Sequence, residues 1–470
     1  MEDRRLSIAK QNRIVLLFCC MAPFAIMNSY MLNLALPEMA AYFGVNTSTA
    51  GWLITMSGII SALGAPIYGK LADIYGVKKL AIFGVILFSA GSAICMVSPS
   101  FPLLMVGRVI QGIGVSSIPS LAMLVPVFYV DAERRGKALG TMASTMALAG
   151  AVGPVVGGVI TGYLHWRFMF LFSVLVLVML PLIMRWLPDQ GAKKSEKMDF
   201  PGAGLLAASV TGLMLSVTLL NPLLLIGSLI GFVIFVIREK KAKNPFVPLP
   251  LFRSSSYRFG LLVGGLNTVM NFGVFLITPL LLSKAYGLEG QWIGLLMAPG
   301  AVVAAVLGKY GGKLADRKGN HYVLRIAAIL LGIGFLSLST LAGYAYWGVS
   351  LSLILTQAGY ILMQPATANW VSASLDREHA GIGMGVYSLS NFLSIALSGA
   401  AMTKLVEFDA LPLVNPIAGS MDQSSIYSNL YLLFFVLALF NLYFAYKMKR
   451  KRAGKEGSIE MKKTATQSNT

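Results

Sequence analysis

Side chains that could carry a charge or a proton are scarce in the apolar stretches of this sequence. All 19 Asp and Glu residues fall in loops, tails or predicted helix ends. The three histidines, His165, His321 and His379, fall in different predicted loops, so they form no catalytic or metal-binding cluster. Arg108 lies well inside an apolar run, where a charge costs at least ~2.5 kcal/mol. It therefore needs a polar partner or a water-filled cavity, unless it is a structural Arg that reaches the outer interface.

Two short charged motifs occur twice in the chain. Gly-Lys-Leu-Ala-Asp at 69–73 returns at 312–316, and Asp-x-Glu-x-x-Gly at 131–136 returns at 376–381. Both motifs return at nearly the same offset, so we interpret the chain as a duplication. Each Gly-Lys-Leu-Ala-Asp copy is expected to be a short charged turn between two membrane helices.

The Gly-Lys-Leu-Ala-Asp motif predicts a conformational latch. Its Asp can cap a neighbouring helix N-terminus or pair with a cation, in a bond that breaks when two halves of the protein rock. Its Gly lets helices approach closely. The alternative is a solvated turn with no such role. The residues assigned to the latch are Gly69, Asp73, Gly76, Lys78, Lys79, Asp316 and Arg317.

A third motif combines small residues with proline. Gly153, Pro154, Gly157 and Gly158 fall within one predicted helix, near 138–162. Small residues let two helix backbones approach, and a proline bends the helix that contains it. We expect this helix to pack closely against a partner and to kink.

Composition identifies the elements that position these residues. Of 470 residues, 56% are hydrophobic and only 12% are charged, which is typical of an integral membrane protein. Apolar runs of about twenty residues favour helices over a barrel. The net charge of +19 comes from Lys and Arg that lie almost entirely in alternate loops and the two tails. This one-sided placement predicts cytoplasmic termini and a basic tail that anchors to lipid headgroups, and it argues against nucleic-acid binding.

The expected fold is all-α, with fourteen transmembrane helices. We expect a six-helix bundle in 1–192, a linker with two extra helices and a cytoplasmic connector in 193–258, a second six-helix bundle in 259–446, and a basic cytoplasmic tail in 447–470. The individual helices are predicted near 13–36, 50–69, 80–98, 102–127, 138–162, 167–187, 202–220, 222–237, 259–283, 291–310, 322–343, 348–371, 382–404 and 426–446.

Together the motifs resemble those of the major facilitator superfamily. Gly153-Pro154-x-x-Gly157-Gly158 is similar to the signature of its drug:proton antiporters, and the central helix pair resembles their fourteen-helix branch. His165-Trp166 is similar to the Gram-positive tetracycline and multidrug exporters. The resemblance implies a monomeric transporter of the bacterial cytoplasmic membrane, which exchanges a small amphiphilic substrate for protons by alternating access about a central cavity. It implies no enzyme activity, metal or cofactor.

The sequence departs from the family at the positions that usually carry protons. Relatives place acids where this chain has Asn28, Gly150 and Ile395. Proton coupling would then use Glu38 or Asp73, or an ionisable group of the substrate. An uncompensated Arg108 favours neutral, zwitterionic or anionic amphiphiles over lipophilic cations. The residues assigned to a substrate or proton pathway are Asn28, Asn33, Glu38, Arg108, Gln111, Asn271, Gln364 and Asn391.

Two alternatives remain at this stage. Each polar residue in the assumed pathway could instead form a hydrogen bond between packed helices. The same scaffold also serves uptake or exchange of a small metabolite or a monovalent cation. A membrane enzyme is not favoured, because no acid, base or metal ligands cluster in the sequence.

Overall fold

A computed structural model describes residues 6–189, 198–219, 221–288, 290–406, 414–415 and 424–467. All regular elements in these residues are helical. The first bundle contains α1 (Ile8–Phe43), α2 (Thr47–Tyr75), α3 (Val77–Val97), α4 (Phe101–Tyr129), η1 (Ala132–Arg134), α5 (Arg135–Tyr163), α6 (Phe168–Val174), η2 (Leu175–Met179) and α7 (Leu180–Trp186).

A helical hairpin and a second bundle follow. The hairpin is α8 (Phe200–Leu219) and α9 (Pro222–Lys241), and the short helix η3 (Leu249–Arg253) lies in the connector after it. The second bundle contains α10 (Ser255–Lys284), α11 (Gly290–Lys318), α12 (Asn320–Leu341), α13 (Tyr346–Ala373), η4 (Arg377–His379), α14 (Ala380–Val406) and α15 (Ser425–Gln467).

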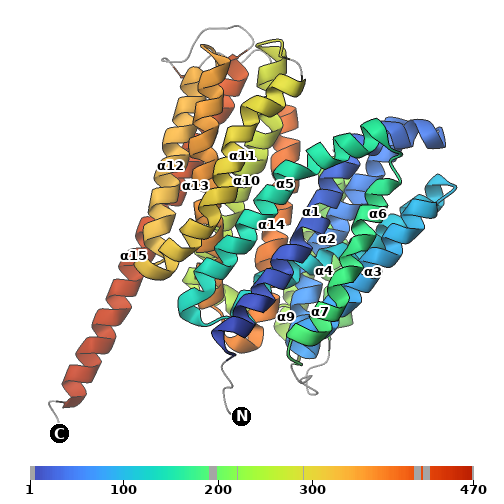
Figure 1. Ribbon diagram of the computed structural model, residues 1–470. Coiled ribbons are helices and arrows are strands. Elements are labelled where there is room, and N and C mark those ends of the chain that lie inside the picture. The colour runs from blue at the N-terminus through green and yellow to red at the C-terminus, as the bar shows by residue number, and fades with distance from the viewer. Residues whose placement is uncertain are drawn as a thin grey trace.

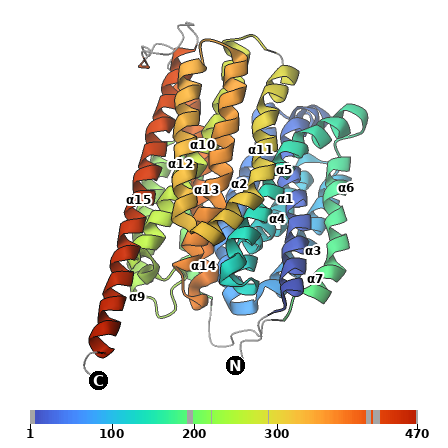
Figure 2. The same ribbon diagram turned by 60° about the vertical axis from the view of Figure 1, so that its left-hand side comes forward.

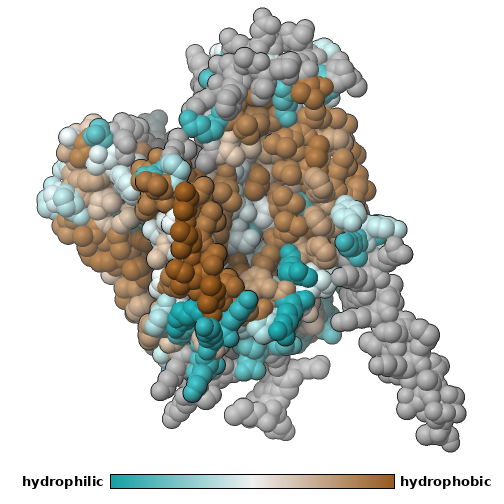
Figure 3. Space-filling model, turned by 180° about the vertical axis from the view of Figure 1, so that it is seen from behind, coloured by the Kyte–Doolittle hydropathy of each residue, from teal (hydrophilic) through white to brown (hydrophobic). Residues whose placement is uncertain are grey.

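The helices have the length and composition of membrane spans. Thirteen described segments are long and apolar enough to cross a bilayer. The 29-residue α5 packs among them, against α1 and α11, so the described chain has thirteen or fourteen candidate membrane helices. Figure 3 shows broad apolar flanks with a hydrophilic band near the lower end. The expected all-α membrane fold is confirmed.

The prediction of a charged turn at 69–73 was wrong. These residues form the last turns of α2, and 312–316 likewise belong to α11. The chain reverses at a single glycine after each helix, Gly76 with φ 83° and Gly319 with φ 87°, a conformation that L side chains rarely adopt. Asp73 and Asp316 therefore project from rigid helices rather than from loops.

Other helix boundaries also differ from those expected. Polar residues that flank the apolar runs continue several helices, so α1 begins at Ile8 and α15 extends to Gln467, through the segment expected to be a tail. The predicted helix at 167–187 is interrupted by the 3₁₀ segment η2. At the start of the expected linker region 193–258, residues 193–197 lie outside the described part of the structure.

Among the described residues, packing between the two bundles is concentrated at one end of the molecule. There, α2 of the first bundle packs against α14 of the second, and α5 packs against α11. Figure 2 shows α11 crossing α5. We call this the closed end; it is the lower end in Figure 1, where α1 begins and α15 ends, whereas the opposite ends of the bundles diverge.

Candidate functional site

The carboxylate of Asp73 joins the two bundles at the closed end. One oxygen, Oδ1, accepts a hydrogen bond from the Gly381 amide at 2.8 Å, and Oδ2 accepts one from the Ile382 amide at 2.9 Å. Both amides belong to the first turn of α14, where backbone N–H groups have no partner within the helix. A carboxylate of the first bundle thus caps a helix of the second.

The carboxylate of Asp316 makes the reciprocal contact. Oδ1 accepts from the Gly136 amide at 2.8 Å and Oδ2 from the Lys137 amide at 2.7 Å, in the first turn of α5. The two duplicated motifs therefore bind each other. The Asp of the first motif in one repeat caps the helix N-terminus that contains the Gly of the second motif in the other repeat. The sequence showed that both motifs are repeated, but not that one motif binds the other. The nearly equal offset of the two repeats was the signal that could have suggested this contact.

Glycines bring the paired helices into backbone contact beside each cap. A Cβ atom on Gly385 of α14 would lie 2.7 Å from the Ala65 carbonyl oxygen of α2. At the other seam, a Cβ on Gly140 of α5 would lie 3.0 Å from the Cα of Gly312. A real side chain at either position would force the seam apart. Gly69 and Gly312 were predicted to allow such an approach, whereas Gly140 and Gly385 were not singled out.

The remaining latch residues lie near these caps without joining the bundles. Lys78 Nζ forms an ion pair with Asp189 at 3.3 Å, within the first bundle. Lys79 is exposed at the start of α3, and Arg317 is exposed in the last turn of α11. The described contacts across the seams are thus made by carboxylates and backbone amides rather than by these cations.

Arg108 is buried inside the first bundle, with 3% of its surface exposed. Its Nη1 donates to Asn28 Oδ1 at 3.1 Å and also to Gln111 Oε1. Its Nη2 donates to Ser57 Oγ at 2.5 Å and to the Leu53 carbonyl oxygen at 3.3 Å. Nε has no partner among the described residues. Four helices, α1, α2, α3 and α4, enclose this guanidinium and its partners.

All the hydrogen-bond acceptors of Arg108 are neutral. A second layer extends the network, since Gln111 Nε2 donates to Ser92 Oγ at 2.7 Å and Asn28 Nδ2 donates to Ser173 Oγ at 2.8 Å. Of the environments expected for Arg108, a polar partner, a water-filled cavity or the outer interface, these contacts supply the first, because its donors are held by neighbouring helices. Its positive charge nevertheless remains without an acidic partner among the described residues.

The second bundle contains a separate polar group. Asn267 and Asn271 lie one turn apart on α10, and their side-chain oxygens have no partner among the described residues. Beside them, Thr268 Oγ1 donates to Asn391 Oδ1 of α14 at 3.2 Å. Asn267 is 2% exposed, so its side-chain oxygen is a buried hydrogen-bond acceptor without a described donor. Gln364 is half-buried on α13.

Other assigned residues are placed as follows. Glu38 is exposed on α1, and the side chain of Asn33 lies outside the described part of the structure. In α5, Gly153 and Gly157 are buried, Gly158 is exposed, and the side chain of Pro154 is not described. A Cβ on Gly158 would meet no atom within 4 Å. At Gly158, therefore, the motif makes no close contact with another helix.

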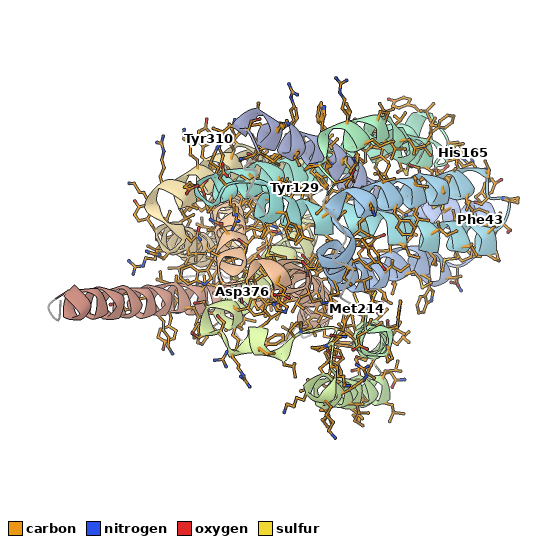
Figure 4. All side chains as sticks on the ribbon, turned by 90° about the horizontal axis from the view of Figure 1, so that it is seen from below. Phe43, Tyr129, His165, Met214, Tyr310 and Asp376 are labelled. Atoms are coloured by element: carbon orange, nitrogen blue, oxygen red, sulfur yellow. The ribbon has the colours of Figure 1, made fainter. Side chains whose placement is uncertain are left out.

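The α8–α9 hairpin covers one of the two seams. α8 contacts both α2 and α14, and Leu206 of α8 shares a buried cluster with Ala62 and Ile382. Viewed from the closed end, Met214 of α8 lies at the periphery, on the opposite side of the molecule from Tyr310 of α11 (Figure 4). The α5–α11 seam has no equivalent contact with the hairpin among the described residues.

An ion-pair cluster missed by sequence reasoning holds this hairpin. Arg238 of α9 binds Asp199 through two bonds of 2.5 and 2.6 Å and Glu239 through one of 3.0 Å. Glu239 in turn accepts from the Val247 amide of the connector at 3.0 Å. The hydrogen bonds from Arg238 hold the pKa of Asp199 below its usual value. The cluster ties both hairpin helices to the connector.

Comparison with known proteins identifies the fold. Residues 18–399 match the Major Facilitator Superfamily profile. The chain is 25% identical to the riboflavin transporter RibZ of Clostridioides difficile, over 83% of this chain and 87% of RibZ. It is 27% identical to the multidrug transporter protein MdtP of Bacillus subtilis, over 83% of this chain and 76% of MdtP. The crystal structure of the human organic anion transporter MFSD10 superposes with a TM-score of 0.66 at 17% identity, covering 91% of this chain and 99% of that one.

The family match and the two duplicated bundles, which reciprocal caps join, identify the fold as that of a membrane transporter. The chain belongs to the Major Facilitator Superfamily.

Proposed function

We propose that this protein exports amphiphilic, drug-like molecules across the bacterial cytoplasmic membrane in exchange for protons. The observation that carries the proposal is the pair of caps at Asp73 and Asp316, in which each bundle holds a helix N-terminus of the other. Such hydrogen bonds can form and break as the two bundles rock as rigid bodies, because they are made between the bundles and not within them.

The caps are of a strength suited to a reversible latch. A carboxylate at a helix N-terminus contributes ~0.3–2 kcal/mol, so two caps bias the closed end by a few kcal/mol at most. Substrate or proton binding supplies free energies of this size. The one-sided placement of Lys and Arg favours termini on the cytoplasmic side, and with that orientation the closed end faces the cytoplasm.

Arg108 informs the substrate class. Its charge is solvated only by neutral groups, so a cation that approached the first bundle would meet an unscreened positive potential. Neutral, zwitterionic or anionic amphiphiles, such as compounds of fluoroquinolone or tetracycline type, are favoured over permanent lipophilic cations. Partnerless oxygens of Asn267 and Asn271 would accept hydrogen bonds from a substrate's hydroxyl or amine groups.

Proton coupling must use an unusual carrier. The described membrane helices place carboxylates only near their ends, and among these Glu38 is exposed on α1 and Asp73 is half-buried in its cap. Protonation of Asp73 would remove the charge that stabilises the cap and so favour opening of the closed end. The substrate's own ionisable group is the other source of a transferred proton.

Exchange or uptake of a small metabolite is the second candidate function. The similarity to RibZ over most of both chains favours it, as does the polar group around Asn267, because a polar metabolite needs more hydrogen-bond partners than an amphiphilic drug.

One experiment separates these functions. The gene would be expressed in an efflux-deficient bacterial host and, in parallel, in a host that cannot make riboflavin. Drug export predicts raised inhibitory concentrations for several unrelated amphiphiles and no growth rescue at limiting riboflavin. Rescue by riboflavin without any change in drug susceptibility would replace the first proposal by the second.

A further inference from the structure

Two cations lie over aromatic rings where membrane spans of the second bundle end. The guanidinium carbon of Arg325 lies 5.3 Å from the ring centroid of Tyr446. Lys447 Nζ lies 5.7 Å from the ring centroids of both Phe259 and Tyr443. Arg325 is in the second turn of α12, and Lys447 is the first residue of the basic run that follows the apolar part of α15 in the sequence. Both charges therefore sit at the level where the apolar part of a bilayer gives way to headgroups.

Arg325 lacks the acceptors that a guanidinium needs. Its Nε and Nη2 are buried and have no hydrogen-bond partner among the described residues. Among the residues that the structure describes, no ion pair joins Arg325 or Lys447 to an acidic side chain. A buried donor left without an acceptor is unfavourable. Arg325 as a residue is half-buried, so a change of side-chain rotamer would bring these donors to an acceptor outside the chain.

The surroundings specify what that acceptor is. Tyr443 and Tyr446 lie one turn apart on α15 and are 55% and 63% exposed, which places their rings toward lipid at headgroup depth. A phosphodiester offers two oxygens in the geometry that a guanidinium fork matches, and Lys447 adds a second positive charge beside it. A zwitterionic headgroup would bring its own cation against Lys447.

We propose that α12 and α15 form a binding site for the phosphodiester of an anionic phospholipid in the leaflet at the closed end. Arg325 and Lys447 bind the phosphate, and the two tyrosines contact the glycerol and the upper acyl chain. This site is separate from the caps and from the Arg108 network, and it does not depend on what the protein transports.

The test is native mass spectrometry of the purified protein, titrated with phosphatidylglycerol or with phosphatidylcholine of the same chain length. Wild type is expected to bind phosphatidylglycerol more tightly, and Arg325→Gln to weaken that binding about fivefold, as expected for one interfacial cation. Arg185→Gln is the matched control, because Arg185 is an exposed Arg near the end of α7 with no aromatic contact described. Lys447→Gln, at an exposed position, is expected to weaken binding by a similar factor and to keep the test usable if Arg325→Gln does not fold.

Two results would overturn the proposal. One is equal retention of phosphatidylglycerol by Arg185→Gln and by the folded site variants. The other is full competition by inorganic phosphate at the same concentration as the lipid, which would indicate a site for a free anion.

Discussion

At the scale of single residues, the caps are the features most open to test. In Asp73→Asn, one carboxamide oxygen can still accept from an amide of α14, but the NH₂ group must face the other amide, and the negative charge is lost. We expect the closed end to be destabilised by ~1–2 kcal/mol, with transport reduced about tenfold at normal expression. Asp316→Asn should behave similarly, because its two amide bonds have the same geometry.

Spin labels at the exposed positions Tyr75 and Glu378 would report the distance across the α2–α14 seam in each variant. A population shift toward longer distances is expected in Asp73→Asn. An unchanged distance distribution, together with unchanged transport, would show that the cap is not a latch.

Arg108 offers a second prediction at this scale. Arg108→Ala would leave the side chains of Asn28, Gln111 and Ser57 without their donor, in a cavity that packing cannot close. We expect a loss of ~3 kcal/mol in stability and loss of transport. Arg108→Lys keeps the charge but cannot reach acceptors on three helices at once, so its thermal stability should be intermediate. A thermal unfolding midpoint of Arg108→Ala equal to that of wild type would contradict the network's structural role.

The kind of role that these residues have could be predicted from the sequence, but the residues that they contact could not. The cost of a charge in an apolar run predicted that Arg108 needs polar partners. It did not predict which groups these are, because Ser57, Ser92 and Ser173 lie on other helices and serine is common in membrane helices. Likewise Asp73 could be recognised as a helix cap, but the helix it caps begins more than 300 residues later, a distance that only tertiary structure bridges.

At the scale of helices, the glycines of the seams are expected to control opening of the closed end. Gly140→Ala would place a methyl group against the backbone of α11, so the α5–α11 seam should separate and transport should fall at least about tenfold. Gly158→Ala in the same helix meets open space and should be tolerated. Both changes add one methyl group to α5. Transport would be measured in everted vesicles for each variant, and a difference between them would reflect only what the added methyl group contacts. Similar activity of the two variants would refute the role of this contact.

The hairpin is expected to be held by a pH-dependent ion pair. Arg238 lowers the pKa of Asp199, so the pair stabilises the folded state above the ordinary carboxyl pKa of 3.8 and loses this effect as pH falls through the lowered value. Arg238→Gln should therefore have a lower thermal midpoint than wild type at pH 7, and the difference should shrink only below about pH 4. A difference that is constant from pH 7 to pH 3 would show that Arg238 acts by packing instead.

The all-helical membrane fold was predictable from apolar runs, but helix ends were not. An apolar run marks the bilayer, whereas a helix ends where its backbone can turn, at Gly76 and Gly319 rather than at the first charged residue. The hairpin's position also escaped sequence reasoning, since two apolar helices carry no signal of which seam they cover.

At the scale of the whole molecule, substrate charge gives the clearest prediction. Competition by a lipophilic dication of ethidium type should be weak in wild type and stronger in Arg108→Gln, if that variant folds, because the repelling charge is removed. Fluoroquinolone-like zwitterions should compete in wild type. Tight dication binding that does not change on removal of Arg108 would overturn the charge argument.

Proton exchange is tested in the same preparation. Substrate addition to unbuffered purified protein should release protons, and the double variant Glu38→Gln, Asp73→Asn should abolish this release unless the substrate carries the proton. Release that persists with a substrate lacking an ionisable group would rule out those two carboxylates as necessary carriers.

The crosswise form of the two caps has a consequence for how such a chain arose. Each repeat supplies one carboxylate and one helix start, and each receives the complement from the other, which is the pattern of an isologous contact in a twofold-symmetric dimer. In an ancestral half-length protein, a single codon change would have altered both caps at once. After two copies fused into one chain, each repeat could change independently. One seam could then acquire a covering hairpin, while the other kept its glycine contact without the hairpin.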